Sequence, residues 1–197
     1  MNKALIGYGG HAREVYSSLS LMERVGLTFF VDDEYYQGEE NTKPLSLFNP
    51  EEYMVMIAIA DPKVRFDISQ KLPKETKYFT FIHPTALIVD NVEIGEGSFI
   101  GAYSILTTNI KIGKHAILNR GNHIGHDCVI GDYFSAMPGA IVSGNVTIYD
   151  LVYMGTNSSI REKLSIHSLS TIGMNSAVVK HIELPGTYVG CPAKLIK

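Results

Sequence analysis

Two histidines stand three residues apart near the middle of the chain, in the stretch GNHIGHDCVIGD at 121–132. The second of them, His126, is followed directly by Asp127. An imidazole titrates near neutral pH and can take a proton as a general base. A carboxylate on its other ring nitrogen fixes the tautomer and stabilises the imidazolium. The stretch alone leaves three interpretations open, namely a catalytic base with its partner, half of a metal site, and two imidazoles on a structural surface.

The elements that must position this pair are repeats of six residues, which run from residue 82 to residue 178 without an insertion. Every sixth residue is apolar, and eleven of the seventeen are isoleucine. They are Ile82, Ile88, Ile94, Ile100, Leu106, Ile112, Leu118, Ile124, Ile130, Ala136, Val142, Ile148, Met154, Ile160, Ile166, Ile172 and Val178. A strict period of six fits neither a single strand nor a helix, and it is typical of a solenoid of short parallel strands.

Glycine follows the apolar residue in seven of these hexads, where we expect a turn that a Cβ would obstruct. These are Gly95, Gly101, Gly113, Gly125, Gly131, Gly155 and Gly173. The fourth residue after the apolar one is small or apolar in nearly every hexad, with Asn122 as the polar exception. His126 is therefore expected at a corner of its coil, whereas Cys128 is expected inside as unreactive packing.

The first 80 residues follow a different pattern. Apolar runs at 3–6, 27–31, 54–60 and 77–82 predict four strands. A helical pattern with Val15, Leu19 and Met22 on one face follows the first run, and Asp61-Pro62 begins a second helix that carries Val64 and Ile68. The order predicts a small parallel sheet of Rossmann-like type at 1–80, before a β-helix domain at 81–197.

The loop after the first strand reads GYGGHA at 7–12, which fits G-x-G-x-x-A between a strand and a helix. Such glycines let the backbone approach a phosphate at a helix N-terminus. Asp32 ends the second strand, where an acid can accept a hydrogen bond from a ribose hydroxyl. Because about 80 residues make only half of a dinucleotide fold, a single nucleotide diphosphate is the better fit. A tight turn that binds nothing is the alternative.

Composition narrows the class of protein further. The net charge of −3 gives no general attraction to nucleic acid or to anionic lipid. The two cysteines, Cys128 and Cys191, do not form a disulfide framework and favour a reducing, cytoplasmic setting. We expect no signal peptide and no membrane span.

A nucleotide-binding half followed by these hexads resembles the bacterial N-acetyltransferases of nucleotide-activated amino sugars, of the bacillosamine and perosamine type. The sialic acid O-acetyltransferases are relatives of the same left-handed β-helix family. The resemblance covers the whole chain. It is carried by GGH at 9–11, Asp32-Asp33, IAIA at 57–60 with Arg65, ILN at 117–119, HDC at 126–128, SGNV at 143–146 and VGCPAK at 189–194.

The resemblance implies a role for each matching residue. His126 would be the general base and Asp127 the acid that raises its basicity. The nucleotide-linked sugar would meet a set of residues in both halves, namely Gly9, Gly10, His11, Asp32, Asp33, Ala60, Arg65 and Asn119. For His11, Arg65 and Asn119 the alternatives are an exposed loop imidazole, a solvated helix face and a turn asparagine that bonds the local backbone.

The same resemblance places the donor, acetyl-CoA, in the groove between neighbouring solenoids of a homotrimer. Gly144 would donate its N–H to the thioester carbonyl. Thr156 and Met174 follow at later turns, and Ser135 stands where several relatives carry a histidine. Lys180, Lys194 and Lys197 are candidates for the CoA phosphates, with a solvated surface lysine as the equal alternative.

We therefore expect an acetyl-CoA-dependent N-acetyltransferase for surface glycan assembly, acting on a UDP-, dTDP- or GDP-linked amino deoxysugar. Alternatives are a sialic acid O-acetyltransferase and a nucleotide-sugar-binding protein without turnover. A zinc site built from His115, His123 and His126 is a further alternative, but such a site has no need of a nucleotide-binding domain. We expect no metal cofactor, and we expect His123 to point outward.

Overall fold

The structure is a computed structural model that describes residues 1–196. The chain divides into two compact units, one of residues 1–80 and one that begins at residue 81, and each is described by itself. Among the described residues no helix is both long enough and apolar enough to cross a membrane.

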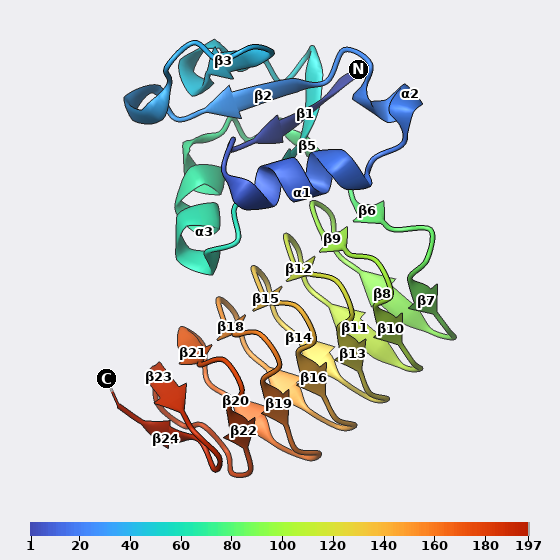
Figure 1. The fold of residues 1–197 in the computed structure, drawn as a ribbon, viewed down its shortest axis with the longest axis vertical. Helices are drawn as coiled ribbons and strands as arrows, with labels where there is room; N and C mark the ends of the chain where they lie inside the picture. Colours follow the sequence, from blue (N-terminus) through green and yellow to red (C-terminus); the bar gives the residue numbers. More distant parts are fainter. Residues whose placement is uncertain (197) are drawn as a thin grey trace. The chain divides into compact units, whose positions relative to one another are not determined.

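The first unit is built on a parallel sheet of five strands in the order β3-β2-β1-β4-β5 (Figure 1). The strands are β1 (Asn2–Ile6), β2 (Thr28–Val31), β3 (Thr42–Pro44), β4 (Tyr53–Ile57) and β5 (Lys77–Tyr78). Its core combines the central strands with α3, through Ala4, Ile6, Phe30, Val55, Ile57 and Ile68. The Rossmann-like expectation is confirmed.

The helices of this unit differ in part from the sequence pattern. Helix α1 (Gly10–Ser18) buries Ala12 and Val15 and ends before Leu19, so Met22 is not on its face. Met22 belongs to the separate short helix α2 (Leu21–Arg24) and is 83% exposed. Helix α3 (Pro62–Lys71) begins as expected, with the Asp61 carboxylate accepting from the N–H of Val64. Two 3₁₀ turns, η1 (Asp33–Tyr35) and η2 (Leu45–Leu47), complete the unit.

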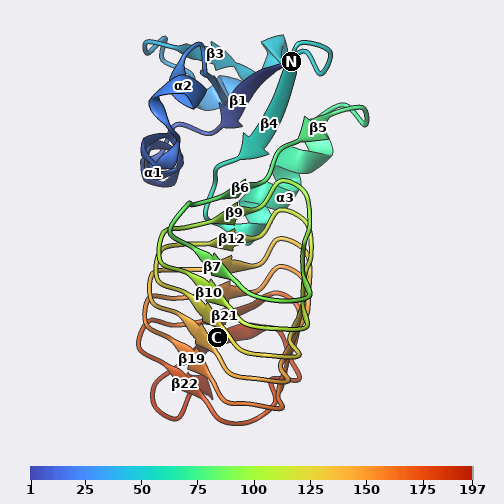
Figure 2. The same cartoon turned by 90° about the vertical axis from the view of Figure 1, so that its right-hand side faces the viewer.

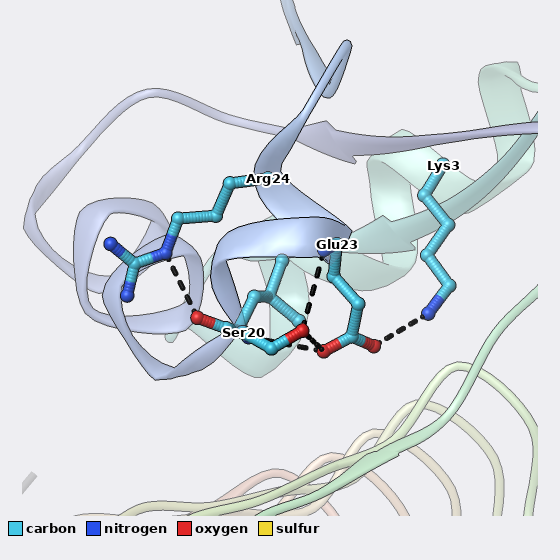
Figure 3. Close-up of polar contacts among 5 residues, drawn as sticks. Lys3, Ser20, Glu23 and Arg24 are labelled. Atoms are coloured by element: carbon cyan, nitrogen blue, oxygen red, sulfur yellow. Dashed lines mark hydrogen bonds and ion pairs between the residues drawn. The ribbon is translucent and has the colours of Figure 1, made fainter.

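Helix α2 is held by a capping box (Figure 3). The Glu23 N–H donates to Ser20 Oγ, the Ser20 N–H donates to Glu23 Oε2, and Lys3 Nζ lies 2.9 Å from Glu23 Oε1. Arg24 Nε donates to the carbonyl of Leu19, past the end of α1. These contacts hold the connection between α1 and β2 in place, although α2 buries no side chain.

The predicted strand at 77–82 is two strands. β5 closes the sheet of the first unit, and β6 (Phe81–Ile82) begins the solenoid by pairing with β9 (Phe99–Ile100). The sequence could not show this division because both pieces are apolar and only two residues separate them. Strand β3 was also missed, since Thr42–Pro44 is short and lacks an apolar pattern.

The second unit is a left-handed parallel β-helix of about six coils, as expected (Figures 1 and 2). Strands one coil, or 18 residues, apart pair in register and form three sheets. One sheet holds β6, β9, β12 (Ile117–Leu118), β15 (Ser135–Ala136), β18 (Tyr153–Met154) and β21 (Ser170–Ile172), followed by β23 (Gly186–Val189) and β24 (Lys194–Leu195).

The other two sheets run beside it. The second holds β7 (Leu87–Ile88), β10 (Ile105–Leu106), β13 (His123–Ile124), β16 (Ile141–Val142), β19 (Ser159–Ile160) and β22 (Ala177–Val178). The third holds β8 (Val92–Ile94), β11 (Ile110–Ile112), β14 (Val129–Ile130), β17 (Thr147–Ile148) and β20 (Ser165–Ile166). Between successive sheets the chain bends at one of three edges that run along the solenoid.

The residues of the six-residue period form the solenoid core. From Ile100 to Val178 all fourteen are buried. Ile82 is 43% exposed and Ile88 and Ile94 are partly exposed, because the first coil has no preceding coil of the solenoid to cover it. Each buried aliphatic residue stacks on its equivalents one coil away, and this stacking gives the edges a fixed register.

The glycines after the core residues lie at turns that a Cβ would obstruct, as expected, but the left-handed backbone of these turns falls on other residues. A Cβ on Gly125 would lie 2.7 Å from the backbone nitrogen of Gly144, so the next coil forbids it. The left-handed backbone falls two residues later, most often on asparagine, and at Asp127 with φ of 60°. Glycine directly after the core residue therefore allows the coils to stack, and asparagine two residues later favours the left-handed conformation.

Candidate active site

The candidate base lies on the edge that follows the second sheet, called here the His126 edge. The residues at its turn positions, one coil apart, are Asp90-Asn91, Thr108-Asn109, His126-Asp127, Gly144-Asn145, Glu162-Lys163 and Lys180-His181. His126 is exposed at the corner, as its place in the hexad predicts, and 57% of its side chain is accessible. Ile124 beside it is buried and fixes the turn.

His126 and Asp127 form the expected pair. Nδ1 of His126 lies 2.7 Å from Oδ2 of Asp127. The left-handed backbone of Asp127 turns its side chain back along the edge toward the imidazole. Because an ionised carboxylate only accepts, Nδ1 carries the proton and Nε2 is the basic nitrogen.

Gly144 lies one coil beyond His126, directly against its ring. A Cβ built on Gly144 would be 2.5 Å from His126 Nε2 and 2.6 Å from Cε1. The Gly144 N–H donates to no acceptor among the described residues, while its carbonyl accepts from Lys163 N. The basic nitrogen and an unused N–H donor therefore lie on neighbouring coils of one edge, the arrangement that acyl transfer requires.

The other oxygen of Asp127 is also bound. Nδ2 of Asn109 donates to Asp127 Oδ1 over 3.2 Å, and Asn91 Nδ2 donates to Asn109 Oδ1 over 3.2 Å. The hydrogen bond from His126, and next the one from Asn109, hold the pKa of Asp127 below its usual value. Asp127 is therefore ionised at neutral pH. Neither asparagine was singled out from the sequence.

Four residues expected near the sugar or the donor lie elsewhere on the solenoid. Asn119, Thr156 and Met174 stand on the edge that follows the first sheet, one face away from His126. Asn119 is 7% exposed, and its Oδ1 accepts from the N–H of Arg120, which is the local contact of a turn asparagine. Ser135 is fully buried in β15, so its side chain does not reach the surface of the chain.

Two of the candidate phosphate ligands come together. Lys180 and Lys194 line one cavity of about 200 Å³ near the C-terminus, with His181 and Tyr188. Lys180 also stands on the His126 edge, three coils beyond the base. Lys197 lies outside the described residues.

The other two histidines of the zinc alternative, His115 and His123, and the core cysteine are accounted for by packing or exposure. His115 is buried on the third edge and stacks on Tyr133, with ring centroids 4.9 Å apart. His123 points outward from β13, as expected. Among the described residues no group of three or more histidine, cysteine or acidic side chains is arranged to hold a metal ion. Cys128 is fully buried, and its burial raises the thiol pKa.

A cavity of about 350 Å³ opens at the carboxyl ends of β1, β2 and β4 in the first unit. Its lining is Ile6, Gly7, Tyr8, Gly9, Val31, Asp32, Tyr35, Glu39, Ile59, Val64 and Ile68. Gly7 has φ of +104°, which only glycine adopts readily, and Gly9 caps α1. A Cβ on Gly9 or Gly10 would meet nothing within 4 Å, so these glycines leave the helix N-terminus open to an anion.

His11 and Arg65 are both buried, whereas the alternatives for these residues were an exposed loop imidazole and a solvated helix face. His11 has 8% of its side chain accessible, and its Nδ1 lies 3.5 Å from Glu14 Oε2. Burial is the main cause that lowers its pKa. Arg65 is fully buried, and its guanidinium donates to the carbonyl of Ile59, so it supports the loop that ends at Ala60. The solvated helix face is therefore the wrong alternative for Arg65.

The two acids after β2 differ in their surroundings. Asp32 lines the cavity and pairs with Lys71, whose Nζ lies 2.6 Å from Oδ2. Asp33 accepts from the N–H of Ser46 over 3.0 Å, and this contact lowers its pKa. Glu39, which the sequence pattern did not indicate, lines the cavity with Oε2 buried and without a hydrogen-bond donor among the described residues.

Comparisons with known proteins find relatives that share this architecture. The model of the PglD N-terminal domain matches residues 3–72. A curated relative, GDP-perosamine N-acetyltransferase of Escherichia coli O157:H7, is 33% identical over 107 residues, which span 54% of this chain and 48% of that relative. The structure of WeeI from Acinetobacter baumannii AYE is similar with a TM-score of 0.85 and 31% identity, over 98% of this chain and 99% of that one. The chain belongs to the hexapeptide-repeat family of nucleotide-amino-sugar N-acetyltransferases.

A further member of this family shows the same architecture. The acetyltransferase domain of PglB from Neisseria gonorrhoeae, solved in complex with acetyl coenzyme A, is 26% identical with a TM-score of 0.83, over 98% of both chains. The resemblance drawn from the hexads and the glycine loop is therefore confirmed. The match to the curated relative spans only about half of that protein.

Proposed function

We propose that this protein transfers the acetyl group of acetyl-CoA to the amino group of a nucleotide-linked amino deoxysugar. The observation that carries this proposal is the His126-Asp127 pair, with its basic nitrogen against Gly144. The Gly144 N–H donates to no acceptor in the described part of the chain. Membership of the family supports the donor and the acceptor class, since one relative is named for GDP-perosamine acetylation and another was solved with acetyl coenzyme A.

In the proposed reaction His126 acts as the base. Its Nε2 takes a proton from the sugar amine as the amine nitrogen attacks the thioester carbonyl. The Gly144 N–H donates to the oxygen that becomes negative in the tetrahedral intermediate. The intermediate then collapses, the carbon–sulfur bond breaks, and the proton on Nε2 passes to the leaving thiolate. No covalent bond to the enzyme forms, because acetyl-CoA is already activated.

The cavity of the first unit is the proposed site of the nucleotide. Gly9 and Gly10 at the start of α1 would receive the diphosphate, as helix N-termini do. Asp32 would meet the ribose, and the apolar wall of Ile59, Val64 and Ile68 would face a base. The relative that acts on GDP-perosamine makes a GDP-linked sugar the first to test, with UDP- and dTDP-linked sugars as the other candidates.

A homotrimer would complete the proposed donor site. In one chain the proposed CoA contacts are divided, with Gly144 and Lys180 on the His126 edge and Thr156 and Met174 on the edge after the first sheet. If three solenoids pack side by side, an edge of one can face another edge of its neighbour, and both groups can line a single groove. We place the trimer in the cytoplasm, in the assembly of a surface glycan.

The deciding experiment measures CoA-thiol release from acetyl-CoA with GDP-, UDP- and dTDP-linked 3-amino and 4-amino deoxysugars. Release with one amino sugar, reduced about 10²- to 10⁴-fold in the His126→Ala variant, is the expected result. Release with free sialic acid alone would assign the protein to O-acetylation instead. Folded protein that binds acetyl-CoA but turns over none of these acceptors would refute the proposed acceptor class.

A further inference from the structure

Three side chains on the His126 edge form a hydrogen-bonded ladder that ends on the base. They are Asn91, Asn109 and Asp127, spaced by 18 residues, which is one coil. All three have left-handed backbone, with φ of 54°, 54° and 60°. Their side chains therefore leave the turn in the same direction and stack along the edge. The first two links are 3.2 Å long, and the link from Asp127 to His126 is 2.7 Å long.

The carboxylate at the end of the ladder sets its direction. Asp127 can only accept, so Asn109 must present its NH₂ group to Oδ1. The carbonyl oxygen of the Asn109 amide then faces Asn91, which must donate in its turn. Both amides are therefore fixed in one orientation, and Oδ1 of Asp127 is engaged on the side away from the imidazole.

We propose that Asn109, supported by Asn91, is a positioning residue for the general base. By holding Oδ1 of Asp127, Asn109 fixes the rotation of the carboxylate so that Oδ2 faces Nδ1 of His126. The imidazole is then kept with its proton on Nδ1 and with Nε2 free to take a proton over Gly144. This role rests on the proposed function for its effect on turnover, but its effect on the imidazole is independent of any substrate.

A backbone explanation also exists for these asparagines. Asparagine tolerates the left-handed conformation, and Asn145, Asn157 and Asn175 hold the same turn position elsewhere. That preference explains the residue type but not a side-chain hydrogen bond to Asp127. A glycine variant distinguishes the two explanations, because it keeps the left-handed backbone and removes only the side-chain hydrogen bond. Glycine already stands at this turn position in Gly97, Gly121 and Gly139.

The test compares Asn109→Gly with the matched variant Asn175→Gly, which makes the same backbone change on another edge. The first readout is the ¹⁵N spectrum of the His126 imidazole at neutral pH, in protein without substrate. We expect one tautomer, protonated on Nδ1, in the wild type and in Asn175→Gly. We expect Asn109→Gly to show a mixture of tautomers, with its melting temperature close to that of the control.

The second readout is acetyl transfer. Asn109→Gly should lower kcat about tenfold, the loss of one hydrogen bond to a charged group, with KM for both substrates within about twofold. Asn109→Ser, which keeps a shorter donor, should recover part of kcat. A wild-type imidazole spectrum in Asn109→Gly would overturn the proposal. If the wild-type enzyme acetylates an acceptor, an unchanged kcat in Asn109→Gly would overturn it as well. A changed spectrum in a protein that acetylates no acceptor would instead refute the proposed function alone.

Discussion

The imidazole of His126 rests against Gly144, one coil along the same edge, so closely that a Cβ on the glycine would lie 2.5 Å from Nε2. The 18-residue register of the solenoid produces this contact, since the two residues occupy equivalent positions in successive coils. The basic nitrogen and the proposed oxyanion donor are therefore held together by the packing of the core beneath them. Neither depends on a flexible loop.

This contact predicts the result of Gly144→Ala. The new methyl group must displace the imidazole, which is more than half exposed and can swing away without unfolding the coil. We expect acetyl transfer to fall about 10²- to 10³-fold, the range found when a base or an oxyanion donor is lost. The melting temperature should change little. Glu162→Ala, at the equivalent exposed position of the next coil, is the control and should keep both values.

Asp127 predicts a second effect on the reaction. Its lowered pKa means that the carboxylate stays charged well below neutral pH, so it supports the imidazolium across the working range. Asp127→Asn removes that charge, and we expect kcat to fall about 10²-fold or more. The measurement is kcat as a function of pH for the wild type and for Asp127→Asn. A variant with unchanged kcat would show that His126 works without its partner.

The cavity of the first unit, which is the proposed nucleotide site, predicts a role for Glu39. Its buried Oε2 has no donor among the described residues, whereas the Glu39 carbonyl is fixed by the N–H and hydroxyl of Thr42. A bound nucleotide that donates to this oxygen would lose roughly tenfold in affinity in Glu39→Gln, about the worth of one hydrogen bond to a charge. Calorimetry with GDP, UDP and dTDP measures this. Glu40→Gln is the neighbouring control, and equal affinities in the two variants would exclude the role.

The six-residue period predicted both the solenoid and the corner position of His126. A core residue every six positions sets the strand length, and the residue two places later must then lie at a corner, as His126 does. The ladder through Asn109 was not predicted, because the six-residue period fixes which residues lie at the corners but not which side chains bond to one another there. The burial of Arg65 was also missed, since an arginine on a helix is usually solvated and its hydrogen bond to the Ile59 carbonyl joins residues that the sequence pattern does not connect.

The two cysteines should differ in reactivity. Cys128 lies in the core with its thiol pKa raised by burial, and its Sγ donates to the carbonyl of Ser143. Cys191 is an exposed free thiol. We expect an aromatic disulfide reagent at neutral pH to modify one thiol per chain in the native state and two in denaturant. Reaction of Cys128 in folded protein would contradict the packing described for this coil.

The capping box of α2 predicts a dependence of stability on pH. The ion pair with Lys3 and the hydrogen bonds from Ser20 lower the pKa of Glu23 from 4.5 to about 2 (Figure 3). A lowered pKa stabilises the folded state above the unfolded value, and this contribution is lost as the pH falls from about 4.5 through about 2. Since a third of the side chain is exposed, we expect Glu23→Gln to cost only about 0.5–1 kcal/mol at pH 7. Urea unfolding at pH 7 and at pH 3 measures the difference, which should narrow in acid. An equal difference at both values would show that the charge of Glu23 does not contribute.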